Sequence, residues 1–140
     1  DHNPPKKSTK YVVAISVFTI AVIAAFMAYG MNPATIKIKD DRLVFTGMYG
    51  ITRTFGEIAG VRLVDSLPDI TLRLNGLSIG GISKGWFKLK EGGNCLLLLS
   101  SRSKPYIVFT ERTGKEIFFN STNGEITETL YQELKKLIHQ

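Results

Sequence analysis

The stretch YVVAISVFTIAVIAAFMAY, residues Tyr11–Tyr29, organises the whole chain. It contains no charged residue and no proline, and valine, isoleucine, alanine and phenylalanine dominate it. A helix rises about 1.5 Å per residue, so roughly 20 apolar residues cross the ~30 Å hydrocarbon core of a bilayer. The stretch therefore predicts a transmembrane helix, with bounds at residues 11–30.

The flanks of this stretch fit membrane interfaces. Tyr11 and Tyr29 bracket it, and Lys10 directly precedes it. Tyrosine rings with a hydroxyl prefer the headgroup region, and lysine stems extend their ammonium groups into it, so these three residues are predicted interface anchors. Residues 1–10 are predicted to form a basic polar tail, and residues 31–34 a short linker after the helix.

A cleaved signal peptide is the alternative interpretation of the same stretch. The three lysines of the tail make a basic leader, and Ala28-Tyr29-Gly30 is an acceptable cleavage site. The apolar run is longer than the roughly 7 to 15 residues of a signal-peptide core, which favours a retained span. The chain would otherwise be an exported protein that has lost this segment. A buried helix of a soluble domain is disfavoured, because the run has no polar face.

From residue 35 to residue 140 the pattern is that of one small domain rich in β-strands. Apolar and polar residues alternate with a period of two in short segments separated by glycine, proline and Asp-Asp turns. The run Cys95–Ser100 is almost continuously apolar, as in a strand with both faces covered. After a capping box at Thr122–Glu125, apolar residues recur at helical spacing to Ile138. The predicted fold class is α+β, mainly β.

The composition does not indicate catalysis or a metal site. His2 and His139 are the only histidines, and Cys95 is the only cysteine, so His-based triads, Cys-rich zinc sites and an internal disulfide have no residues to form them. We expect Cys95 to be a buried apolar side chain and expect no cofactor. The formal net charge is +6, but the charges are interspersed and do not indicate nucleic-acid binding.

The glycine-rich segment 76–85 does not match a nucleotide-binding loop. Its spacing fits neither GxGxxG nor GxxxxGK[ST], and no βαβ pattern surrounds it. Glycine permits a positive φ and a close approach of two backbones. The segment is therefore interpreted as a turn followed by a strongly bent strand.

Several local motifs carry a resemblance to a known family. They are Phe55–Val61, Gly80–Phe87, Lys104–Thr110 and Thr129–Leu134. Together they resemble the bacterial PH (pleckstrin-homology-like) domain families, which are membrane-anchored and mostly of unknown function. The resemblance implies an antiparallel PH-like barrel of about seven strands over residues 35–140, closed by the C-terminal helix, on a single-pass protein of the bacterial cell membrane.

Two functions remain in competition. The first is a non-catalytic interaction module that mediates protein contacts or self-association at the membrane surface. The alternative is a lipid or small-ligand binding module, because the resemblance implies headgroup contact by basic residues of the first hairpin, here Lys37, Lys39 and Arg42. Asp40 and Asp41 at the turn oppose an approaching phosphate. Lysines lie on both sides of the apolar run, so the side of the membrane is left open.

Overall fold

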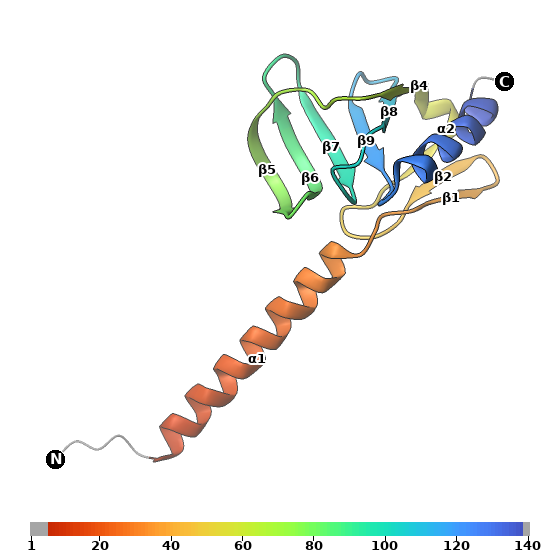
Figure 1. Ribbon diagram of the computed structural model, residues 1–140. Helices are drawn as coiled ribbons and strands as arrows, with labels where there is room; N and C mark the ends of the chain where they lie inside the picture. Colours follow the sequence, from red (N-terminus) through yellow and green to blue (C-terminus); the bar gives the residue numbers. More distant parts are fainter. Residues whose placement is uncertain (1–5, 139–140) are drawn as a thin grey trace.

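The computed structural model describes residues 6–138 and consists of one long helix followed by a β-rich domain (Figure 1). Helix α1 spans Lys6–Met31, and helix α2 spans Gly124–Ile138 at the other end of the described chain. Between them lie nine strands and one 3₁₀ turn: β1 Ile36–Lys39, β2 Arg42–Phe45, β3 Thr52–Thr54, η1 Phe55–Glu57, β4 Ile58–Val64, β5 Ile70–Ile79, β6 Ile82–Leu89, β7 Asn94–Leu99, β8 Tyr106–Glu111 and β9 Glu116–Asn120.

Helix α1 projects from the domain, and nearly all its described side chains are exposed. The segment Ser8–Met31 is long and apolar enough to cross a membrane, a property that it shares with signal sequences. Lys10, Tyr11 and Tyr29 all lie exposed on this helix. Residues 6–10, predicted as part of a polar tail, are its first turns, and residues 1–5 of that tail lie outside the described residues.

The strands form two sheets with open edges. The smaller has the order β1-β2-β3, and the larger has the order β4-β8-β9-β7-β6-β5. All pairs are antiparallel except β7 and β9, which run parallel. The prediction of a closed antiparallel barrel of about seven strands is therefore wrong in strand number, in closure and in this pair. The hairpin of β8 and β9 inserts between β4 and β7, so consecutive strands are not neighbours there.

The larger sheet is apolar on both faces. On one face a core cluster that includes Leu96, Leu98 and Phe109 packs against the small sheet and against α2. On the other face Cys95 and Leu97 belong to a second cluster. Alternate residues of β7 thus enter different clusters, which confirms the prediction of a strand covered on both sides.

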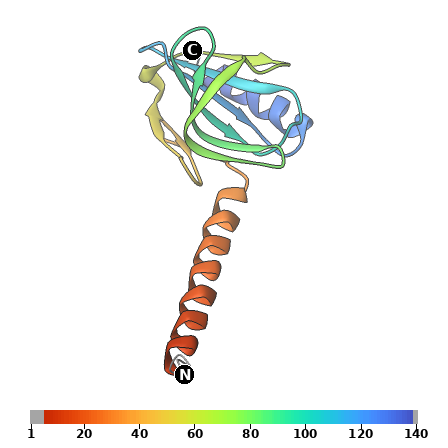
Figure 2. The same cartoon turned by 90° about the vertical axis from the view of Figure 1, so that its left-hand side faces the viewer.

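The domain holds the end of α1 closely (Figures 1 and 2). Gly30 is buried, and a Cβ there would lie 2.6 Å from Cδ2 of Leu77 on β5. The fully buried Lys84 of β6 donates from Nζ to the carbonyl oxygen of Asn32. Ala34 enters the first core cluster, and its N–H donates to Ser100 Oγ at 3.1 Å. The predicted linker 31–34 is therefore partly built into the domain.

As a result, one side of the domain adjoins the end of α1. The connections on it include residues 46–51, 79–82 and 100–105 (Figure 1). We call this side the α1-side face. The turn between β1 and β2 lies elsewhere, at the end of a hairpin that extends away from α1.

Helix α2 packs against the sheet through Leu134, which is fully buried in the first core cluster. The helix begins at an N-terminal cap formed by Asn123. Asn123 Oδ1 accepts a hydrogen bond from the Glu125 N–H at 2.8 Å, and the Asn123 carbonyl accepts one from the Thr127 N–H at 3.1 Å. The capping oxygen thus comes from Asn123 and not from Thr122, one residue later than the sequence suggested.

Replacing Asn123 with alanine is expected to lower the free energy of unfolding by about 1 kcal/mol, because one N–H of the first turn of α2 loses its acceptor. Urea unfolding of the full chain in detergent measures this change. Thr122→Ala is the control and is expected to change stability by less, since its side chain is exposed. Equal losses for the two variants would contradict the assignment of the cap.

Candidate functional site

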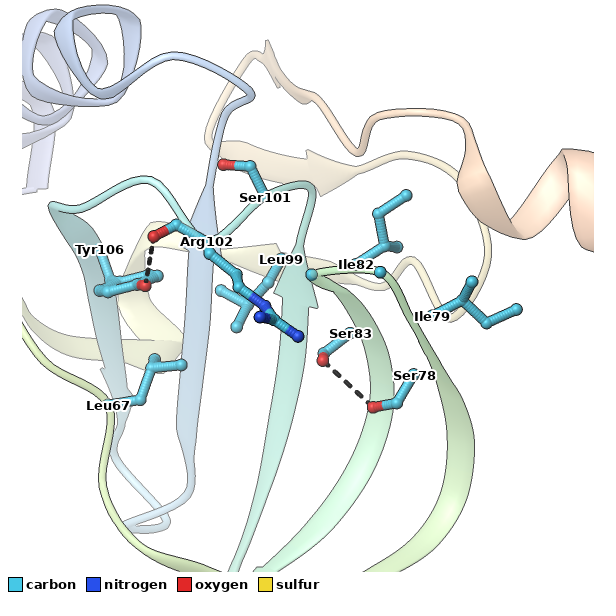
Figure 3. Close-up of a pocket in the computed structure, with 11 residues that line it drawn as sticks. Leu67, Ser78, Ile79, Ile82, Ser83, Leu99, Ser101, Arg102 and Tyr106 are labelled. Carbon is cyan, nitrogen blue, oxygen red and sulfur yellow. Dashed lines mark hydrogen bonds between the residues drawn. The ribbon is translucent and has the colours of Figure 1, made fainter.

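A cavity of about 420 Å³ opens between the β5–β6 turn and the connection from β7 to β8 (Figure 3). It lies at the second core cluster, next to the α1-side face. We call it the Arg102 pocket. Its walls include Leu67, Ser78, Ser83, Leu99, Arg102 and Tyr106. A volume of this size lies within the range of small-ligand pockets, roughly 300 to 1,000 Å³.

Arg102 is the cation of this pocket. In Figure 3 its side chain extends from the β7–β8 connection toward Ser78 and Ser83, whose hydroxyl oxygens lie 3.2 Å apart. Within residues 6–138 no carboxylate lies at ion-pair distance from its guanidinium, and the ion pairs formed there use other arginines. Its N–H donors are therefore directed into a cavity that also presents hydroxyl groups, an arrangement suited to an oxyanion.

The segment that carries Arg102 is held by the buried Asn120 of β9. Asn120 Oδ1 accepts from the Ser100 N–H at 2.8 Å, and its Nδ2 donates to the carbonyls of Ser101 and Ser103, each at 3.0 Å. Tyr106 donates its hydroxyl to the Arg102 carbonyl at 3.1 Å. A fully buried amide that has all these partners fixes the connection, so the backbone that carries the exposed Arg102 side chain is positioned in advance of any ligand.

Gly81 allows the stem of Arg102 to lie against the β5–β6 turn. Its φ is +103°, and a Cβ there would lie 2.9 Å from Arg102 Cγ. The neighbouring Gly80, with φ +59°, has open space in the Cβ direction. Both glycines have a positive φ, which favours glycine. Only at Gly81 would a Cβ also occupy the space of the Arg102 side chain.

The basic residues selected from the sequence lie elsewhere. Lys39 and Arg42 face each other across the β1–β2 hairpin, and strand alternation puts Lys37 on the same face. All three are exposed, and Arg42 Nε lies 3.8 Å from Asp41 Oδ1. The structure thus brings these cations together, but on the hairpin that extends away from α1 (Figure 1).

The Arg102 pocket could not be predicted from the sequence, because the residues that line it are far apart along the chain. Their proximity depends on the β6–β7 register, in which Ser83 is opposite Leu99. The available signals were the Gly80-Gly81 pair and the polar run Ser101–Lys104, each of which reads as an ordinary turn when taken alone.

Lys84 is a second unusual cation, and its role is structural. Burial lowers the pKa of its ammonium group, because the charged form loses its hydration. Its acceptor, the Asn32 carbonyl, directly follows the C-terminal end of α1, where the helix dipole favours a positive charge. Lys84 therefore connects β6, the strand next to the edge strand β5, to the end of α1.

Cys95 is fully buried, as the sequence predicted. Burial, with a smaller contribution from the charge of Glu116, raises the pKa of its thiol to about 11. The thiolate is the reactive form of cysteine, so this side chain is inert in the folded protein.

The thiol of Cys95 is expected to resist iodoacetamide at pH 8 in the folded chain and to react readily in denaturant, since both access and ionisation are restored there. Mass spectrometry of the alkylated chain follows the reaction. Equal rates of alkylation with and without denaturant would contradict the burial of this residue.

Strand β5 offers a different kind of surface. It forms the edge of the larger sheet and pairs only with β6. Three of its aliphatic side chains are exposed, Ile70 at 38%, Leu72 at 54% and Leu74 at 45%. An edge strand presents unpaired backbone N–H and C=O groups, and with exposed aliphatic side chains it is a site for strand addition.

Within residues 6–138 no group of three or more histidine, cysteine, aspartate or glutamate side chains is placed to hold a metal ion. Comparisons with protein-family models, with curated proteins and with solved structures found no match to this chain. A functional assignment must therefore come from the geometry of the chain itself.

Proposed function

We propose that this chain is a membrane-anchored, non-catalytic interaction module that uses the edge of β5 to bind a protein partner. In this proposal α1 is retained as a single membrane span, in a bacterial cell membrane as the family resemblance implies. The exposed edge of β5, with the side chains of Ile70, Leu72 and Leu74, is the observation that carries the proposal.

The packing of Gly30 supports retention of α1. Gly30 belongs to the sequence that would serve as a cleavage site, yet it is buried and a Cβ there would meet Leu77 and Met48. A segment removed on export has no packing role in the mature domain. The contacts of Asn32 and Ala34 with Lys84 and Ser100 would be kept by a cleaved chain, so the support for retention comes from Gly30.

The orientation of β5 favours a different protein as its partner over a second copy of the chain. The C-terminal part of β5 lies at α1, because Leu77 adjoins Gly30. Two β5 strands related by a two-fold axis would pair antiparallel and would place their α1 helices at opposite ends of the strand pair. Two anchors in one bilayer cannot satisfy that arrangement. An extended segment of another protein has no such constraint.

A relationship to the bacterial PH families stays a prediction. The order of an N-terminal helix, a β-rich domain and a C-terminal helix supports it, while the parallel pairing of β7 and β9 differs from the antiparallel barrel that it implies.

Photo-crosslinking in native membranes tests the proposed function. A benzophenone amino acid at Leu72 of the full chain is expected to give one crosslinked species of defined mass, and Leu74→Lys is expected to remove it. The same group at Glu128, an exposed position on α2, is the control and is expected to give none. A product at twice the mass of the chain would show that the partner of β5 is a second copy of this chain and not a different protein. No product from Leu72, or equal products from both sites, would contradict the proposal.

A further inference from the structure

We infer that the Arg102 pocket binds the phosphate of an anionic phospholipid in the membrane that holds α1. The inference goes beyond protein binding by β5, and it rests on the proposed anchoring by α1. The ligand is recognised by its chemistry, a phosphodiester at the end of two acyl chains whose negative charge is not cancelled by a cation in the same headgroup.

The position of the pocket is the first argument. The β5–β6 turn and the connection that carries Arg102 both lie on the α1-side face (Figure 1). Because Gly30, Asn32 and Ala34 fix the end of α1 against the domain, that face is turned toward the bilayer whenever α1 spans it. The pocket then lies at the level of the headgroups.

The side chains around the turn provide the second argument. Ile79 and Ile82 flank Gly80-Gly81 at the rim of the pocket and are partly exposed, and in Figure 3 their side chains extend away from Arg102. Aliphatic side chains next to a cation favour binding at a bilayer interface. The aliphatic side chains enter the boundary of the acyl chains, and the cation contacts the lipid phosphates.

The polar groups of the pocket provide the third argument. A guanidinium offers paired N–H donors that match two phosphate oxygens, and the hydroxyls of Ser78 and Ser83 can donate to a third. Arg102 has no competing carboxylate at ion-pair distance within residues 6–138. Asn120 already fixes its segment, so less conformational entropy is lost on binding.

Hydrogen exchange of the full chain in nanodiscs tests the inference. We compare discs of phosphatidylcholine with discs that also contain phosphatidylglycerol. Exchange of the amides in segments 78–83 and 100–104 is expected to slow by on the order of tenfold with phosphatidylglycerol, the factor that one charge-assisted hydrogen bond supplies. Soluble glycerol phosphate, added to the phosphatidylcholine discs, is expected to give no such protection.

Two pairs of variants separate the pocket from general surface charge. Arg102→Gln is expected to abolish the protection, while Arg73→Gln, which removes an exposed arginine outside the pocket, is expected to retain it. Gly81→Ala keeps the charge but displaces the Arg102 stem, and it is expected to lose the protection that Gly80→Ala retains. Unchanged exchange in segments outside the pocket verifies that each variant is folded.

Each other outcome overturns the inference. Equal exchange in the two kinds of disc, or equal effects of Arg102→Gln and Arg73→Gln, would contradict the pocket assignment alone. Protection by glycerol phosphate without phosphatidylglycerol would assign the pocket to a soluble phosphate ester. A chain that fails to enter the discs would contradict the anchoring and the pocket assignment together.

Discussion

Replacing Gly85 with alanine is expected to lower the free energy of unfolding by about 2 to 6 kcal/mol. Gly85 lies in β6 with φ +127°, and a Cβ there would collide with the Asn75 carbonyl oxygen and lie 2.5 Å from Gly76 Cα. Both obstacles belong to the backbone of β5, so no rotamer change relieves them. Backbone strain and overpacking each cost about 1 to 3 kcal/mol, which together give this range.

A matched control separates these two costs. Gly92 has a similar φ of +110°, but a Cβ there meets nothing within 4 Å. Gly92→Ala is therefore expected to show the strain alone, roughly 1 to 3 kcal/mol. Denaturant unfolding of both variants gives the comparison. A loss for Gly85→Ala no greater than for Gly92→Ala would show that β5 and β6 are not so close at this point.

Introducing two arginines into the middle of α1, as Ile20→Arg with Ile23→Arg, is expected to remove the chain from the membrane fraction. Each arginine costs about 2.5 to 3.5 kcal/mol at the centre of a span. Both positions are exposed on α1, at 66% and 54%, so no contact with the domain is lost. Sedimentation of membranes after alkaline extraction measures the change.

The conservative pair Ile20→Leu with Ile23→Leu is the control for α1. Leucine keeps the segment apolar, so this variant is expected to remain in the membrane pellet with the wild-type chain. If the double-arginine variant also stayed in the pellet, the chain would be held by something other than α1.

Local patterns were enough to predict most elements of this fold. The uncharged run at residues 11–29 predicts α1, and the unbroken apolar run at residues 95–100 predicts a strand buried on both faces. The glycine segment was interpreted as a turn and a bent strand, and Gly85 confirms the close backbone approach. In each case the residues that decide the structure are neighbours in sequence.

The neighbours of each strand were not predictable in this way. Asn75-Gly76 has the sequence of a hairpin turn, yet β5 continues through it to Ile79 and turns at Gly80-Gly81. Close packing of Gly76 against Lys84 and Gly85 outweighs the local turn preference. Likewise the β8–β9 hairpin lies between β4 and β7 because of tertiary packing, which no alternation of apolar residues records.

The same limit explains which cations were found. Lys37, Lys39 and Arg42 are visible in the sequence because they are close together along one hairpin. Arg102 and Lys84 gain their roles only through strands and loops that are distant in sequence. Arg102 is exposed, as the three hairpin cations are, and it differs from them in lining a cavity, which the local sequence does not record.

The mass of the mature chain in its native membrane tests the central claim, a retained α1 that carries the domain, most directly. Membranes are extracted with alkaline carbonate, and the chain in the pellet and in the supernatant is measured by intact mass spectrometry. We expect a chain that stays in the pellet and whose mass includes residues 8–31. A chain in the supernatant whose mass corresponds to a first residue at or near Met31 would contradict the retention of α1.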